Sequence, residues 1–204
     1  MATTTPNYGW TVPTSTDLVK DGATAIETLG DAIDASMNTA LGTKKAGMVL
    51  LNTTSFSAVA SQSVNDVFST TYDNYRILVS NITGSTNLSL QLRLRVGGAD
   101  NSTASSYGYL GVYATTSVLY SAANAASLTT IANVGASHPA SLVMDVFNPF
   151  KTTRTSFHIV SRNDDNNYLN VGGVHTQAVS YTGFSLISST GTMTGSVSVY
   201  GYNA

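Results

Sequence analysis

The chain has 204 residues, only 10% of them charged, and a formal net charge of −2. Its few Lys and Arg residues are scattered, which argues against a nucleic-acid-binding surface, because such a surface needs clustered cations. It contains no cysteine, so disulfides and thiolate metal sites are excluded, and we expect no cofactor.

Two further absences concern membranes and export. The longest apolar run, Met48–Leu51, is far too short to cross a bilayer. Residues Met1–Pro6 lack the basic and apolar regions of a signal peptide. We therefore expect a protein that neither inserts into a membrane nor carries an export signal.

The first segment, residues 1–13, is predicted to be an extended arm. Pro6 and Pro13 disfavour helix in the residues before them. Tyr8 and Trp10 are the only large aromatic residues of the arm, and Trp10 is the sole tryptophan of the chain. Because the arm has no core of its own, we interpret these side chains as anchors that press into a partner. The alternative is that they fold back on the β-region that follows.

Residues 14–45 are predicted to form a short amphipathic helix and a linker. Thr14 and Asp17 have the spacing of a capping box, so the helix is expected to start near Thr14–Thr16, and Gly42 is a suitable stop. Apolar residues then recur with a heptad step, which is the pattern of a coiled coil. One row is Val19, Ile26, Ile33 and Ala40, and the other is Gly22, Leu29 and Ser36. The alternative is a surface helix packed on the β-region, and the two rows do not settle an oligomeric state.

From residue 46 to residue 204 the hydrophobic period changes to two, which predicts a β-domain. In Leu88–Val96 the leucines and Val96 alternate with Ser, Gln and Arg, so one face of this strand is expected to be buried. Many short strands with frequent turns and no interleaved helices indicate an antiparallel β-sandwich of jelly-roll type. Ser121–Ala126 lacks bulky residues and is predicted to be a loop or one helical turn. The strands are expected at Met48–Val59, Val64–Phe68, Asn74–Ile82, Leu88–Val96, Tyr107–Ala114, Leu128–Val134, Ala140–Phe147, Thr155–Arg162, Tyr168–His175, Phe184–Ser188 and Thr192–Tyr202.

Few residues of the chain could carry chemistry. His138, His158 and His175 lie far apart and lack the spacing of metal ligands. No nucleophile elbow or phosphate loop is present, so we expect no enzymatic activity. Asp164-Asp165 lies in an amide-rich loop that could bind calcium, although a solvated hairpin loop is the simpler interpretation.

Tyrosine is in excess, with 11 copies. Tyr107, Tyr109, Tyr113 and Tyr120 cluster in one third of the β-region, and Tyr200 and Tyr202 close the chain. Such side chains suit contacts with carbohydrate or protein, because a ring supplies area and a hydroxyl at little entropy cost. They equally suit packing inside a sandwich.

Four segments together resemble small tail-fibre and minor structural proteins of tailed bacteriophages. The opening Tyr8–Ala23 is similar to their N-terminal signature. Phe68–Ile77, Asn148–Phe150 and Gly195–Tyr202 are similar to pieces of their C-terminal β-domain.

The resemblance implies a virion protein, assembled in the host cytoplasm, that is usually a homotrimer with a jelly-roll head. It implies that the arm, through Tyr8, Trp10 and Val12, attaches to other virion structural proteins. The helix would trimerise through Val19, Ile26, Leu29 and Ile33, and the head would be free to contact a host-surface glycan or protein.

Two alternatives stay open at this stage. The protein could decorate or stabilise the capsid rather than serve a tail. A carbohydrate-active enzyme with a jelly-roll head is a third possibility, against which stands the lack of a recognisable acid pair.

Overall fold

The computed structural model describes residues 3–14, 16, 18–41, 47–113, 118–162 and 168–202. The chain divides into two units, Met1–Gly47 and Met48–Ala204, and each is described by itself. The predicted cap residue Asp17, the helix stop Gly42 and the Asp164-Asp165 loop lie outside the described residues.

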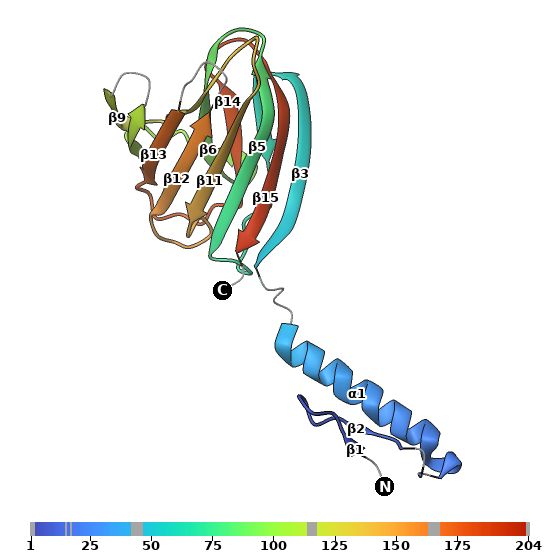
Figure 1. Cartoon of the computed structure of the whole chain (residues 1–204). Coiled ribbons are helices and arrows are strands. Elements are labelled where there is room, and N and C mark those ends of the chain that lie inside the picture. Colours follow the sequence, from blue (N-terminus) through green and yellow to red (C-terminus); the bar gives the residue numbers. More distant parts are fainter. Residues whose placement is uncertain are drawn as a thin grey trace. The chain divides into compact units, whose positions relative to one another are not determined.

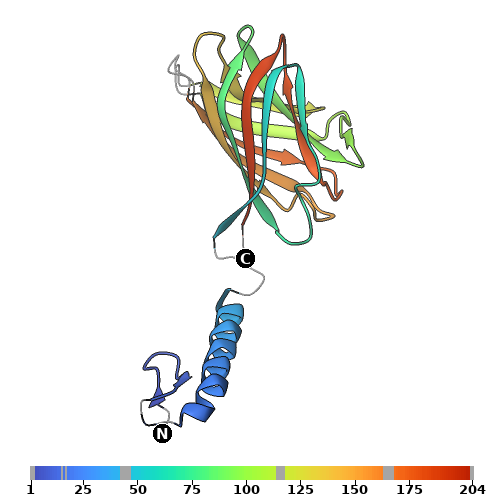
Figure 2. The same ribbon diagram turned by 90° about the vertical axis from the view of Figure 1, so that its right-hand side faces the viewer.

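The first unit is a small hairpin beside one helix (Figure 2). Strands β1 (Thr3–Thr4) and β2 (Thr11–Val12) pair antiparallel, so the arm folds back on itself instead of running extended. Gly9 takes a positive φ of 67° in the connection, a conformation that favours glycine. The arm thus satisfies part of its backbone hydrogen bonding internally.

The helical segment starts later than predicted. A 3₁₀ turn, η1 (Val19–Asp21), leads into α1 (Gly22–Leu41). Leu18 precedes the turn in an extended conformation, with φ −66° and ψ 133°, so neither Thr14 nor Thr16 belongs to the helix. Thr14 and Thr16 hydrogen-bond to each other through their hydroxyls at 3.0 Å.

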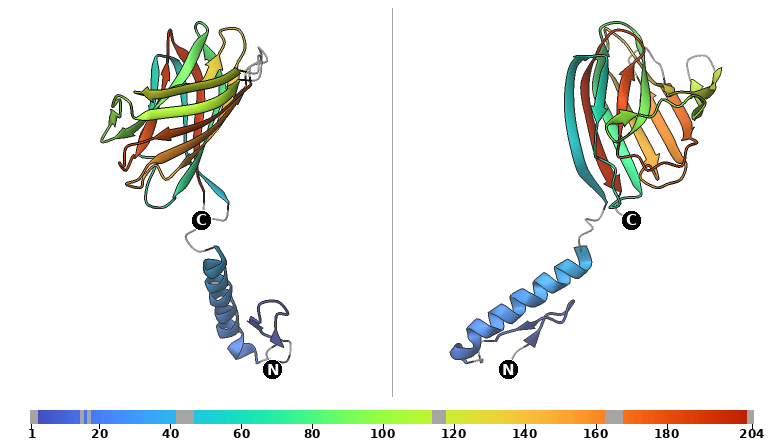
Figure 3. Two further views of the ribbon diagram at one scale, coloured as in Figure 1. Left: turned by 90° about the vertical axis from the view of Figure 1, so that its left-hand side faces the viewer. Right: turned by 180° about the vertical axis from the view of Figure 1, so that it is seen from behind.

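The second unit consists of two antiparallel sheets that pack face to face. Figure 1 and the right-hand view of Figure 3 show it from opposite sides. The larger sheet has eight strands in the order β3-β15-β5-β11-β12-β13-β8-β9, and the smaller has the order β10-β6-β14-β4 with β7 paired to β6. The strands are β3 (Met48–Val59), β4 (Ser61–Val64), β5 (Asn74–Gly84), β6 (Leu88–Val96), β7 (Ala99–Asp100), β8 (Tyr107–Tyr113), β9 (Val118–Ala125), β10 (Leu128–Val134), β11 (Ala140–Phe147), β12 (Thr155–Arg162), β13 (Tyr168–His175), β14 (Gly183–Ser188) and β15 (Met193–Tyr202).

The core lies between the sheets and follows from the alternation along each strand. In β6 the four leucines are buried and the residues between them are half-buried, as the period of two requires. From the larger sheet Tyr75, Ile77 and Val79 face them, and Val197 and Val199 of β15 are also fully buried.

Two predictions about the β-region were wrong. Val64–Phe68 is not a strand: β4 ends at Val64, Asp66 has a positive φ of 54°, and the N–H groups of Val67 and Phe68 both donate to the Thr182 carbonyl. The segment predicted as a loop at Ser121–Ala126 belongs mostly to β9, whose backbone pairs with β8 at the edge of the larger sheet. Backbone pairing, not side-chain pattern, makes β9 a strand.

Candidate functional site

The arm is held to the helix by its tryptophan. Nε1 of Trp10 donates a hydrogen bond to Oγ of Ser36 at 2.9 Å, and the Tyr8 ring stacks on the Trp10 ring at a centroid distance of 5.1 Å. Two backbone bonds between Thr5 and the turn, to Gly9 and Trp10, fix the hairpin that carries both rings. Tyr8 and Trp10 therefore lie together on one face of α1, and Val12 is half-buried in β2.

Next to these rings lies a shallow apolar groove of about 350 Å³. Tyr8 forms one wall, although 70% of its surface is exposed. Residues from the second half of α1 form the other wall: Ala35, Ser36, Thr39 and Ala40. An exposed ring beside an apolar groove is a surface that a partner protein could cover.

The predicted heptad residues do not share one environment. Val19 and Ile26 are exposed, at 98% and 66%, whereas Leu29 and Ile33 are half-buried. Leu29 and Ser36 are one heptad apart, so they lie on the same side of the helix, and Ser36 binds Trp10. The chain's own hairpin thus covers part of the stripe that the resemblance assigned to trimer contacts.

A second stripe stays open along α1 and η1, and we call it the exposed row. Its residues repeat with steps of four and three, which is heptad spacing in a register different from the predicted one. All of them are exposed except Ile33, which is half-buried. Val19, Ile26 and Ile33 also belong to the predicted heptad rows. Ala23 and Gly30 would let a neighbouring helix approach closely, because their side chains are small or absent. The exposed row consists of Val19, Ala23, Ile26, Gly30, Ile33 and Met37.

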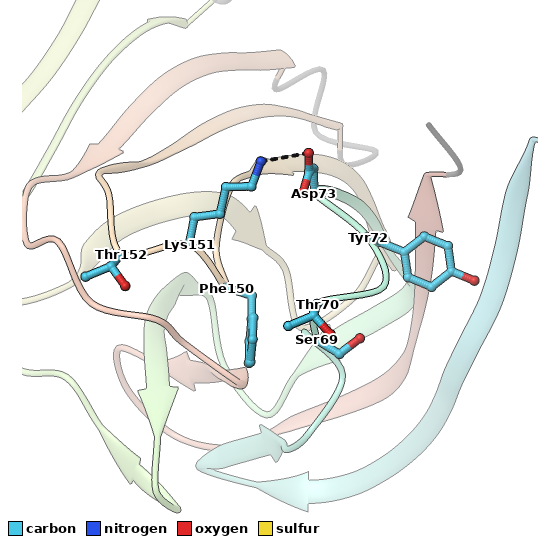
Figure 4. A pocket seen from close by; sticks show the side chains of 7 residues that line it. All are labelled: Ser69, Thr70, Tyr72, Asp73, Phe150, Lys151 and Thr152. Carbon is cyan, nitrogen blue, oxygen red and sulfur yellow. Dashed lines mark ion pairs between the residues drawn. The ribbon is translucent and has the colours of Figure 1, made fainter. Parts of the chain in front are cut away.

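The second unit carries a pocket of about 300 Å³ between two loops that are far apart in sequence (Figure 4). One loop, between β4 and β5, supplies Ser69, Thr70, Tyr72 and Asp73. The other, between β11 and β12, supplies Phe150, Lys151 and Thr152. Nζ of Lys151 lies 2.7 Å from Oδ2 of Asp73, and this ion pair joins the loops at the rim. Phe150 packs against the hydrophobic core of the second unit.

The loops that form this pocket are anchored by hydrogen bonds to their backbone. The Asn148 N–H donates to the Asp73 carbonyl at 2.9 Å, which ties one loop to the other. The Tyr75 hydroxyl accepts from the Ser69 N–H at 2.8 Å and donates to the Ser69 carbonyl at 3.0 Å. The Tyr181 N–H donates to the Pro149 carbonyl at 2.8 Å. The walls are therefore largely formed before any ligand binds, which lowers the entropy cost of binding.

A buried polar network lies deeper in the same unit. Nε2 of His175 lies 2.5 Å from the Tyr181 hydroxyl, which accepts from Nδ2 of Asn101 at 2.7 Å. Burial lowers the pKa of His175 to about 4, partly opposed by the Ser106 carbonyl, so the ring is neutral at pH 7. Because His175 is fully buried, a substrate cannot reach it, and the network is structural.

The three histidines are not brought together. His138 lies in the connection between β10 and β11, and His158 binds Oδ1 of Asn170 at 3.1 Å on the open face of the larger sheet. Within the described ranges no three His, Asp or Glu residues are placed to hold one metal ion. Tyr107 and Tyr109 pack in the core, which favours the packing interpretation for these two tyrosines.

Sequence reasoning missed the pocket because both of its loops lie outside the periodic segments. The one available signal was Asn148-Pro149-Phe150, a turn sequence followed by an aromatic residue. Asn148 has a positive φ of 57° and turns the chain so that Phe150 and Lys151 line the pocket.

Comparisons with known proteins assign no relative to the chain: no family model matches it, and neither the curated proteins nor the solved structures contain a significant match. Among the described residues, no helix is both long enough and apolar enough to cross a membrane.

Proposed function

We propose that this chain is a structural protein of a bacteriophage virion, a homotrimeric fibre attached by its N-terminal unit. In this proposal α1 forms a short parallel three-stranded coiled coil, and the β-sandwich is a jelly-roll head presented to the host surface. The resemblance of Tyr8–Ala23 and of three head segments to small tail-fibre proteins supports the assignment to a virion.

The observation that carries the proposal is the exposed row on α1. A helix of this length is marginal in water unless an apolar stripe is covered. The hairpin covers the side that bears Leu29 and Ser36, and leaves Val19 and Ile26 to solvent in the single chain. Burying each of these two side chains would contribute about 1.5–3 kcal/mol to association. A second and third copy of the same helix supply matching rows.

The arm supplies the attachment surface in this proposal. Trp10 is fixed by Ser36, and Tyr8 stacks on it with most of its ring exposed. Together with the apolar groove along α1, this ring forms a preformed contact for another virion protein. Aromatic side chains in such positions commonly dominate the energy of an interface.

Light scattering on the purified full-length chain tests the assembly. We expect a mass near three times 21.3 kDa that persists on dilution. Ile26→Asp should shift the mass to that of one chain, because it places a charge in the exposed row. Thr28→Asp adds the same charge about half a turn away on the helix and should leave the trimer intact. A monomeric wild type, or equal effects of both variants, would refute the coiled coil.

Attachment needs its own experiment. Tyr8→Ala should abolish binding of the purified trimer to fibreless particles while the mass in light scattering stays unchanged. Tyr168→Ala is the matched control, since Tyr168 is an exposed tyrosine of the second unit. Undiminished binding of Tyr8→Ala would refute the role of the arm.

A further inference from the structure

We infer that the pocket between Asp73 and Lys151 binds a single neutral sugar residue. The inference deepens the proposed function and rests on it only for biological context: a fibre head needs a ligand on the surface it meets. The sugar-binding chemistry itself is argued from the pocket alone.

The size and composition of the pocket set the ligand class. A volume of about 300 Å³ lies at the lower end of small-molecule sites and suits one six-membered ring rather than a chain. Phe150 supplies an apolar surface, and Ser69, Thr70 and Thr152 supply hydroxyls around it. A ligand that contacts both the Phe150 ring and these hydroxyls must have an apolar face and several hydroxyl groups, as a pyranose has.

The ion pair decides between neutral and charged ligands. Lys151 and Asp73 are each half exposed, so both retain free hydrogen-bonding capacity toward the pocket. An ammonium donates only, and a carboxylate accepts only. Placed 2.7 Å apart, they present a donor beside an acceptor, which matches two neighbouring hydroxyls of one sugar. Their charges cancel, so the pair gives little attraction to phosphate or to a free ammonium.

The arrangement of the side chains fits such a ligand. In Figure 4 the ion pair closes one end of the hollow, and Phe150 lies near Thr70 and Ser69 below it. The Tyr72 ring points away from the ion pair. It lies over Gly201, where an added Cβ would come within 2.5 Å of the ring. Phe150 is therefore the ring available to stack on the sugar, whereas the Tyr72 ring packs on Gly201.

Saturation-transfer NMR on the full-length protein tests this inference with a panel of methyl glycosides of glucose, galactose, mannose and N-acetylglucosamine. We expect transfer to at least one glycoside, with a Kd of about 1 mM, as is ordinary for a single small ligand. Asp73→Asn and Lys151→Met should each weaken that binding about tenfold, through lost charge-assisted hydrogen bonds.

Two matched variants separate the pocket from general charge effects. Asp66→Asn removes a carboxylate from the same loop, and Asn tolerates the positive φ found there. Arg154→Met removes an exposed cation three residues from Lys151. Neither residue lines the pocket, so both variants should bind the glycoside like the wild type. Unchanged melting temperatures in all four variants would show that the fold is intact.

The inference is overturned if no glycoside of the panel receives saturation, or if Asp73→Asn and Lys151→Met bind as well as Asp66→Asn and Arg154→Met. Binding of inorganic phosphate at this pocket in place of the glycosides would also overturn it. None of these results bears on trimer mass or on particle attachment, so failure here and failure of the fibre proposal are distinguishable.

Discussion

The only tryptophan of the chain, Trp10, donates its indole N–H to the hydroxyl of Ser36, 26 residues further along. This bond joins a hairpin of two-residue strands to a helix, and neither element would be stable by itself. It also decides which side of α1 the hairpin covers and which side stays exposed.

Ser36→Ala should loosen the hairpin without unfolding the helix. Losing one hydrogen bond costs about 1 kcal/mol, so exchange of the Gly9 and Trp10 amide protons should speed up about fivefold. The emission of Trp10 should shift to longer wavelength as water reaches the indole. Asn38→Ala, at an exposed position of the same helix, is the control. Equal exchange rates in the wild type and Ser36→Ala would mean that the bond does not hold the hairpin.

Tyr202→Phe tests a charged cluster on the open face of the larger sheet. The Tyr202 hydroxyl donates to Oδ1 of Asp145 at 2.6 Å, and Arg76 binds both carboxylate oxygens at 2.8 Å. Burial opposes ionisation of Asp145, but the hydrogen bonds from Arg76 and Tyr202 outweigh it and keep its pKa below the usual value. The variant should lose about 1 kcal/mol of unfolding free energy at pH 7.

The same variant should raise the pKa of Asp145 toward its usual range, which carboxyl-detected NMR would measure. Because the folded-state pKa is lowered, the cluster stabilises the protein above the unfolded-state pKa, and this contribution is lost as pH falls through the folded-state pKa. Tyr200→Phe lies two residues away on β15 and leaves the Asp145 contact intact. An Asp145 pKa that does not move in Tyr202→Phe would contradict this account.

The sequence predicted most strands to within a residue because burial on one face imposes a period of two. Leu88–Val96 and Ala140–Phe147 are the clearest cases. It failed at β9, an edge strand poor in bulky residues, where pairing with β8 determines the structure. It could not reveal the pocket, because Asp73 and Lys151 meet only after two loops have been placed by the sheets between them.

The arm and helix show a different limit of sequence reasoning. The heptad step correctly marks an amphipathic helix, yet it does not say which neighbour covers which row. The hairpin turn around Gly9 and the bond from Trp10 to Ser36 belong to the tertiary structure, which the heptad pattern does not encode. They leave Leu29 half-buried and Ile26 exposed, which the heptad pattern treats as equivalent.

Gly183 and Gly172 both lie in strands, but only Gly172 has room for an added Cβ. A Cβ at Gly183 would lie 2.2 Å from the Val64 carbonyl oxygen, a backbone atom held by the pairing of β14 with β4. Gly183→Ala should therefore cost about 1–3 kcal/mol of unfolding free energy, as overpacking does. At Gly172 the nearest atom is the Leu110 carbonyl oxygen at 3.9 Å, so Gly172→Ala should change stability by no more than about 0.5 kcal/mol. Urea denaturation of both variants measures the difference, and similar losses would contradict the close approach at Gly183.

The buried His175 should make the second unit sensitive to mild acid. Its pKa is about 4 in the folded protein, against 6.5 for an ordinary histidine. Between these values the unfolded chain binds a proton that the folded chain does not, so stability falls as pH decreases from about 6.5 to about 4. The loss attributable to this ring is about 1 kcal/mol at pH 5.5 and about 2–3 kcal/mol at pH 4.5.

Urea denaturation of the wild type and His175→Gln at pH 7, 5.5 and 4.5 isolates this contribution from those of the carboxylates. Gln cannot take up a proton, and its amide can still reach toward the Tyr181 hydroxyl that His175 contacts. The variant should be less stable at pH 7, because it replaces a packed ring, but its stability should fall less steeply with acid. His158→Gln, which changes the exposed histidine of the open sheet face, should keep the steep wild-type dependence. If His175→Gln and the wild type lose stability in parallel, the neutral buried ring is not the source of acid sensitivity, and the network around Tyr181 must accommodate an imidazolium.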